Sequence, residues 1–168
     1  FPTRRSSDLL TDNIKLAQKV TAELEVQLAK LPRAEIAKLA LEKNGLIIVA
    51  DNIKECMELA NVSAPEHLEI LTADPFNLLP LVRHAGAVFL GAYSPEPLGD
   101  YFAGPNHVLP TGGTARFYSV LNVETFMKRT SIISYTKEAL QAVQDDIISL
   151  AEAEGLTAHA NAIRVRGE

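Results

Sequence analysis

The stretch NGLIIVADNIKECMEL, residues 44–59, decides the class of fold. Asn44-Gly45 is a typical helix stop, because both residues tolerate a left-handed backbone. LIIVA, residues 46–50, is a short uninterrupted apolar run, which indicates a buried strand. Asp51 can then cap the helix that follows. A helix, a strand and a helix in this order predict a layered α/β architecture.

A second strand is expected further along the chain. Asp74-Pro75 is a typical helix opening, and Gly86 can end the helix that follows. AVFLG, residues 87–91, is the next apolar run and predicts another buried strand. Because parallel strands need long crossover connections, two strands separated by helices favour a parallel sheet.

Two helices are predicted before the quoted stretch. Apolar residues recur at helical spacing over residues 11–31, with Asp12 in position to cap a long amphipathic helix. Pro32 suits the first turn of a second helix, which ends at Asn44-Gly45. Residues 1–9, FPTRRSSDL, show no such period and resemble a translated sequencing adapter. We interpret them as a non-native leader and exclude them from the fold.

We expect the chain to divide into two domains near residue 120. Residues 10–120 are expected to form an α/β unit, a partial Rossmann-like layer with parallel strands. Residues 121–168 are expected to form a small helical C-terminal domain, too small for a robust core of its own. Its predicted elements are short helices at 122–128 and 157–165, a strand-like segment at 131–135, and a helix that Thr136 caps and Gly155 ends.

Composition excludes several classes of partner. The chain has 168 residues, a formal net charge of -5 and no run rich in Lys or Arg, so we expect neither nucleic acid nor an anionic membrane as a partner. No apolar run approaches the roughly 18 residues of a membrane span, and we expect a cytoplasmic protein. Cys56 is the single cysteine, which excludes an internal disulfide. Its place in an apolar helical pattern favours a packing residue over a nucleophile.

Three pairs of side chains have the chemistry of a site. Glu66 and His67, in APEHLE, combine a carboxylate with the side chain that titrates near neutrality. Neighbours on a regular helix point about 100° apart, so the two share a cavity only if the backbone turns at Pro65. The residues alone favour a helix N-terminus here, with Glu66 stabilised by the helix dipole.

The other two pairs depend on turns. Asp100 and His107 lie in GDYFAGPNHVLP, residues 99–110, whose Gly and Pro residues argue against a helix, and both side chains are possible metal ligands. Glu154 and His159 lie on either side of Gly155, which lets both face one surface. For both pairs, solvated polar residues are the alternative that the pattern favours.

Four segments together strongly resemble the C-terminal part of histidinol dehydrogenases. They are NVSAPEHLEI, GAVFLGAYSPEPLGDYFAGPNHVLPTGGTARF, KRTSIISY and LAEAEGLTAHANAI, and the similarity runs from about residue 10 to residue 166. The resemblance implies a cytoplasmic enzyme of histidine biosynthesis that oxidises L-histidinol to L-histidine in two steps, through histidinaldehyde, with NAD and zinc. For the three pairs of side chains above, the resemblance favours a catalytic site over a helix N-terminus or solvated polar residues.

The resemblance also implies roles for particular residues. Glu66 and His67 match the family's catalytic acid/base pair, and Asp100 and His159 match two of its zinc ligands. Glu154 matches a residue that holds the substrate's amino group. The implied substrate-binding residues are His67, Asp100, His107, Glu154 and His159. The resemblance also implies a homodimer, in which the C-terminal domain serves the active site of the partner subunit.

The family's other two zinc ligands, a Gln and a His, and most of its NAD-binding domain precede the matching segment. The residues that contact NAD are therefore unknown, and the sequence offers no dinucleotide fingerprint. We expect the chain alone to be inactive and to bind zinc weakly. The alternatives are a homologous dehydrogenase for another small polar alcohol, and a non-catalytic dimerisation or ligand-binding module.

Overall fold

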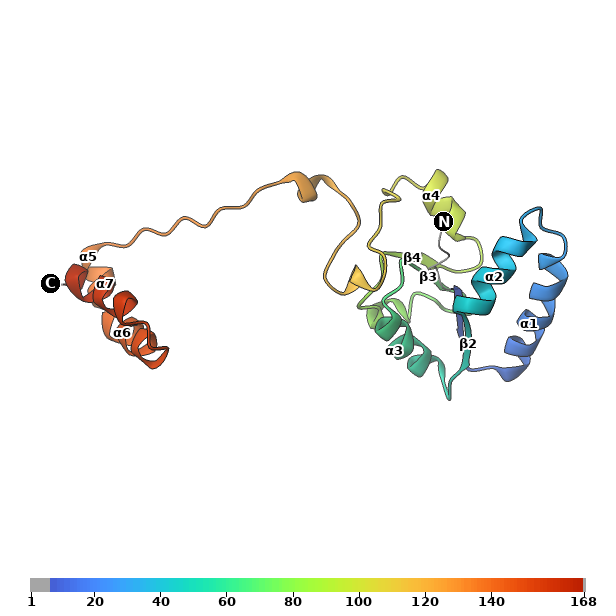
Figure 1. Cartoon of the computed structure of the whole chain (residues 1–168), viewed down its shortest axis with the longest axis horizontal. Helices are drawn as coiled ribbons and strands as arrows, with labels where there is room; N and C mark the ends of the chain where they lie inside the picture. The colour runs from blue at the N-terminus through green and yellow to red at the C-terminus, as the bar shows by residue number, and fades with distance from the viewer. Residues whose placement is uncertain (1–6, 168) are drawn as a thin grey trace. The chain divides into compact units, whose positions relative to one another are not determined.

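The structure is a computed structural model that describes residues 7–167 (Figure 1). The chain divides into two compact units, one ending at Phe126 and the other beginning at Met127. Sequence analysis places this division near residue 120. Each unit is described by itself.

The first unit is a mixture of short parallel strands and helices, as the sequence predicts. Its elements are β1 (Ser7–Thr11), α1 (Ile14–Leu28), α2 (Ala34–Asn44), β2 (Gly45–Val49), α3 (Ile53–Ser63), β3 (His67–Ile70), the 3-10 helix η1 (Leu79–Leu81), β4 (Ala87–Leu90), α4 (Glu96–Tyr101), and the 3-10 helices η2 (Thr114–Arg116) and η3 (Val123–Phe126).

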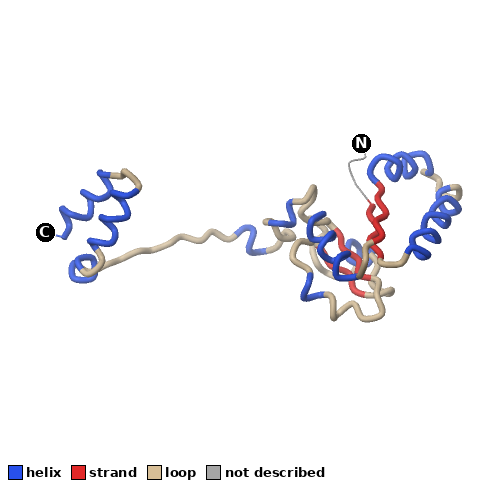
Figure 2. The backbone as a smooth tube through the Cα atoms, turned by 90° about the horizontal axis from the view of Figure 1, so that it is seen from below, coloured by secondary structure: helices blue, strands red, loops and turns tan. Residues whose placement is uncertain are grey.

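The strands form two separate two-stranded sheets, both parallel (Figure 2). The predicted strands are confirmed as β2 and β4, but they do not pair with each other. β2 pairs with β1, from Ser7 opposite Gly45 to Thr11 opposite Val49. β4 pairs with β3, from His67 opposite Ala87 to Ile70 opposite Leu90. Parallel strands are thus confirmed, and the Rossmann-like arrangement stays a prediction.

The first sheet includes residues of the segment interpreted above as a non-native leader. Ser7 to Leu9 lie in β1, and residues 1–6 of the interpreted leader lie outside the described residues. Pairing of β1 requires backbone groups alone, so it does not test whether these residues are native. The helices α1 and α2 pack beside this sheet (Figure 2). β2 is less buried than expected, because Leu46 is 50% exposed and Val49 42% exposed.

The helices begin close to their predicted positions. Asn13, not Asp12, caps α1, and its side chain accepts hydrogen bonds from the N–H groups of Lys15 and Leu16. Asn52, not Asp51, caps α3 by accepting a bond from Glu55 N–H. α3 supplies much of the buried core of this unit through Cys56, Met57 and Ala60.

The expected helix from Asp74-Pro75 to Gly86 is wrong, because the structure has only the 3-10 turn η1 there. Pro80 lacks the N–H that a helix interior needs. The buried Asn61 side chain then binds the segment that follows. It donates to Leu81 O at 2.8 Å and accepts from Arg83 N at 2.7 Å and His84 N at 3.1 Å. These bonds hold the chain in an irregular conformation up to β4.

The second unit is helical, as expected, and contains α5 (Lys137–Gln141), α6 (Gln144–Ala153) and α7 (Thr157–Gly167). Thr136 caps α5 by accepting a bond from Ala139 N–H. Gly155 takes the predicted left-handed conformation, with φ of 73°, between α6 and α7. These two helices pack through the buried Ala151 and Ala160. Residues 131–135 form no strand in the structure.

None of the helices within residues 7–167 has both the length and the apolar character needed to cross a membrane.

Candidate functional site

The backbone before β3 turns where the chemistry requires it. Ala64 ends α3 in a left-handed conformation, with φ of 49°, and Pro65 cannot continue the helix because it has no N–H. The helix N-terminus expected for Glu66 and His67 is therefore wrong, since His67 begins a strand. Glu66 binds β4 through its backbone, where its carbonyl accepts from Ala87 N at 2.9 Å.

β3 and α4 bring three ionisable side chains together. His67 is the first residue of β3. Glu96 and Asp100 are four residues apart on α4, so they lie on one face of that helix. The Nε2 atom of His67 lies 3.7 Å from Glu96 Oε1 and 3.9 Å from Asp100 Oδ1. The structure thus places an imidazole opposite two carboxylates.

Two contacts hold α4 against the second sheet. The carboxylate of Glu69, on β3, accepts a hydrogen bond from Glu96 N–H at 2.8 Å. Gly99 lies against the ring of Phe89 on β4, because a Cβ atom at this glycine would lie 2.6 Å from Phe89 Cε1. The expectation that Gly keeps residues 99–110 from helical structure is wrong for Gly99 to Tyr101. These residues form the last turn of α4, since the missing Cβ allows close packing.

The ionisable groups of this cluster are partly shielded from solvent and affect one another. His67 Nε2 is shielded from solvent and has no hydrogen-bond partner among the described residues. Burial raises the pKa of the Glu96 carboxyl. A hydrogen bond with Asp100 and repulsion from its charge raise this pKa further, whereas His67 acts in the opposite direction. A partly buried imidazole nitrogen thus faces two carboxylates that interact with each other.

A cavity of about 450 Å³ adjoins Asp100. Its wall is mainly apolar and includes Phe89, Leu98 and Val120, with Asn106 as a polar member. The volume lies in the range of small-molecule pockets, and an apolar wall with few polar groups is typical of them. The cavity therefore suits a small organic ligand whose polar end lies near Asp100.

The donor set of the cluster also suits a metal ion. Three possible ligand atoms, one each from His67, Glu96 and Asp100, lie within 4.8 Å of one another. Nitrogen and carboxylate oxygen atoms are suitable ligands for Zn²⁺. Asp100, a predicted zinc ligand, therefore has an environment that fits zinc. His67 Nε2, which has no hydrogen-bond partner among the described residues, faces the Asp100 carboxylate.

The structure does not bring every predicted site residue into this cluster. Glu66 lies in the bend just before β3 and is not one of the three clustered residues. His107 is exposed in the loop after α4. Glu154, which follows α6, and His159, in the first turn of α7, are exposed residues of the second unit. The roles of these four residues stay predictions.

Glu69 and Glu96 are not among the site residues predicted from the sequence. Glu96 has a local signal, because Glu96 and Asp100 stand four residues apart in PEPLGDY and Pro97 suits the first turn of a helix. Glu69 lies two residues from His67, and alternation along a strand puts the two on the same face. That signal requires knowing that HLEI is a strand.

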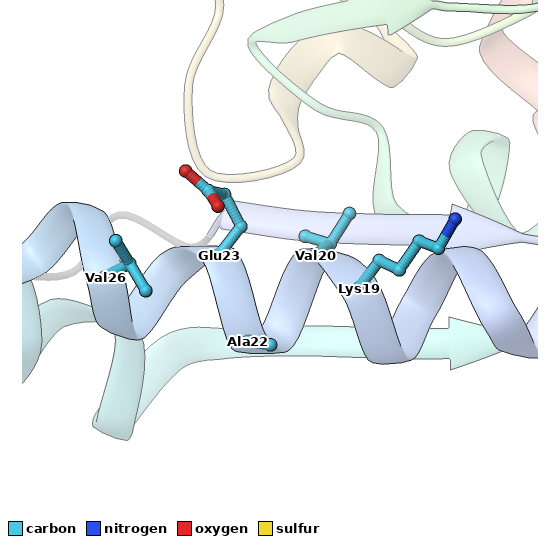
Figure 3. A pocket seen from close by; sticks show the side chains of 5 residues that line it. All are labelled: Lys19, Val20, Ala22, Glu23 and Val26. Carbon is cyan, nitrogen blue, oxygen red and sulfur yellow. The ribbon is translucent and has the colours of Figure 1, made fainter.

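A second hollow, of about 530 Å³, lies on α1 and contains none of the predicted site residues. Figure 3 shows the five side chains that line it, and all come from this one helix: Lys19, Val20, Ala22, Glu23 and Val26. It is an open hollow on a helix face, with no cluster of catalytic groups.

Comparisons with known proteins agree on one family. A family model described as histidinol dehydrogenase matches residues 3–167. A histidinol dehydrogenase of Heliobacterium mobile is 56% identical over 165 residues, which are 98% of this chain and 39% of that protein. One from Bacillus cereus is 54% identical over 165 residues, 98% of this chain and 38% of that protein.

A solved structure agrees as well. The crystal structure of histidinol dehydrogenase from Elizabethkingia anophelis is 40% identical, with a TM-score of 0.75, and the match covers 96% of this chain and 37% of that one. The chain spans about two fifths of the length of the curated relatives it matches.

Proposed function

We propose that this chain, which belongs to the histidinol dehydrogenase family, is part of an enzyme that oxidises L-histidinol to L-histidine in histidine biosynthesis. The proposed enzyme is NAD-dependent, zinc-assisted, homodimeric and cytoplasmic, with neither nucleic acid nor a membrane as a partner. The observation that carries the proposal is the convergence of β3 and α4, with His67 Nε2 3.9 Å from Asp100 Oδ1.

His67 and Glu66 are the proposed acid/base residues. An alcohol loses its hydroxyl proton and a hydride in each oxidation, and His67 Nε2 is the proposed acceptor of that proton. Its shielding from solvent supports this role, since a general base works best where water does not compete for it. Glu66 would activate the water that adds to histidinaldehyde before the second oxidation. NAD, when bound, supplies the hydride acceptor.

Asp100 and His159 are the proposed zinc ligands of this chain. Asp100 lies where nitrogen and oxygen donors converge, which supports its part in a metal site. Zinc, when bound, supplies a Lewis acid that polarises the substrate's oxygen. His107 and Glu154 are proposed to contact the substrate, and Glu154 would bind its amino group through a charge-assisted bond.

The chain alone is proposed to be inactive. A catalytic zinc site normally has three protein ligands, and the family pattern gives this chain two. Leu46, Ile47 and Val49 of β2 are 50%, 38% and 42% exposed in this chain, which agrees with a complete enzyme in which further residues cover this sheet. In the proposed homodimer, Glu154 and His159 serve the site of the partner subunit.

The test uses a completed enzyme, in which residues 10–167 of this chain replace the matching segment of one of the relatives described above. NADH formation is followed with histidinol, with histidinaldehyde and with other small amino alcohols, each with and without a chelator. We expect histidinol-dependent, chelator-sensitive NADH formation. A completed enzyme that folds and dimerises without oxidising any of these substrates would contradict the proposal.

A further inference from the structure

We propose that Glu69 is a positioning residue, which fixes α4 so that Glu96 and Asp100 stay opposite His67. The purpose of that placement rests on the proposed function, but the placement itself does not. Glu69 is not one of the three clustered residues, and its carboxylate binds a backbone N–H.

The spacing of residues along β3 supports this role for Glu69. His67 and Glu69 are two residues apart in a strand, so their side chains lie on the same face of the second sheet. One of them faces the carboxylates of α4, and the other binds the first N–H of that helix. One face of β3 therefore carries both His67, which the carboxylates of α4 face, and Glu69, which anchors that helix.

The short helix α4 needs an anchor outside its own sequence. It has six residues, and isolated helices this short are marginal in water. Gly99 lowers its helix propensity further. Pro95, at the N-cap position, provides no side-chain hydrogen bond. Glu69 supplies the missing acceptor from another element, and its negative charge is favourable at a helix N-terminus.

The hydrogen bond to Glu69 determines where the carboxylates of α4 lie. The Glu69 bond is made to the N–H of Glu96, the residue whose carboxylate lies 3.7 Å from His67 Nε2. Asp100 lies one helical turn further along the same face. Contact between Gly99 and Phe89 holds the other end of α4. Loss of the Glu69 bond should therefore loosen the first turn of α4 and leave the rest of the unit folded.

The experiment compares three variants of this chain with the wild type. Glu69→Ala removes the acceptor, Glu69→Gln keeps a carbonyl oxygen at the same reach, and Glu58→Ala removes an exposed carboxylate of α3 as the matched control. Amide hydrogen exchange at Glu96 is measured by NMR, together with the imidazole resonances of His67 at one fixed pH.

We expect Glu69→Ala to increase exchange at Glu96 about fivefold, the effect of one hydrogen bond, and to shift the His67 resonances. Glu69→Gln should restore most of the protection, and Glu58→Ala should change neither signal. Unchanged exchange at Glu96 in Glu69→Ala would overturn the proposal. So would an equal increase at all amides of the first unit, because that is a general loss of stability.

A second arm separates this proposal from the proposed function. In the completed enzyme, Glu69→Ala should lower kcat about tenfold with little change in the KM for NAD, and Glu69→Gln should recover most of kcat. If the wild-type completed enzyme does not oxidise histidinol, the proposed function fails, while exchange at Glu96 still decides the positioning role. If Glu96 loses protection and kcat is unchanged, Glu69 positions α4 as proposed, but the purpose given to that placement in the reaction is overturned.

Discussion

His67 Nε2 lies 3.9 Å from Oδ1 of Asp100, although one residue begins a strand and the other lies in the last turn of a helix. The contact exists because α3 ends at Ala64 and because α4 packs closely on β4. The chemistry of the site therefore depends on packing at Gly99 and on the turn at Pro65 as much as on the reactive side chains.

Gly99→Ala should displace α4. The added Cβ would lie 2.6 Å from Phe89 Cε1, closer than two carbon atoms can approach. We expect a loss of about 1–3 kcal/mol in the free energy of unfolding, the usual cost of an overpacked contact. Chemical denaturation of this chain measures it.

Phe89→Leu is the matched second substitution, because a smaller side chain makes room for the new methyl group. The double variant should lose less stability than the sum of the two single variants. Additive losses would show that Gly99 and Phe89 do not pack against each other.

Asn61→Ala should destabilise the segment before β4. The substitution leaves the N–H groups of Arg83 and His84 and the carbonyl of Leu81 without their partner. A buried unsatisfied group costs about 1–3 kcal/mol, and these groups are partly buried, so the expected loss in the free energy of unfolding for all three together is of that order. Asn77→Ala, at an exposed position, is the control and should cost far less. Equal losses in the two variants would contradict this description of Asn61.

Cys56 should make stability depend on alkaline pH. Burial, followed by the nearby charges of Asp12 and Glu55, raises the pKa of this thiol above 9.0. The folded protein therefore resists ionisation of Cys56 more than the unfolded chain does. Stability from this group is fully present below pH 9.0 and falls as the pH rises through the folded-state pKa.

Cys56→Ala removes this contribution, so thermal unfolding measured from pH 8 to 11 should fall less steeply with pH in the variant than in the wild type. Reaction of the folded protein with a thiol reagent should also be slow, because Cys56 is 3% exposed. Identical pH profiles for the two proteins would contradict the raised pKa.

Much of the fold is predictable from local patterns. Uninterrupted apolar runs identify β2 and β4, Thr136 marks the start of α5, and Gly155 marks the break between α6 and α7. The other two strands carry no such signal. HLEI places charged and polar residues among apolar ones, and its strand conformation follows from the turn at Ala64 and from pairing with β4.

The candidate site is predictable in part. His67 and Asp100 carry the chemistry expected of a site, and the structure brings them together. Glu96 escapes notice because the Gly and Pro residues around it suggest a loop, whereas Gly99 is what allows the helix to pack. Glu69 escapes notice because its partner is a backbone N–H far along the chain. Bonds between distant segments leave no periodic pattern in a sequence.

The most direct test of the central claim measures zinc content and histidinol-dependent NADH formation side by side in the completed enzyme. Asp100→Ala should lose both bound zinc and activity, because a ligand is removed. His67→Asn should lose activity at least a hundredfold, as expected for removal of a general base. His84→Gln, outside the cluster, should keep both. Full zinc content together with full activity in either Asp100→Ala or His67→Asn would contradict the account.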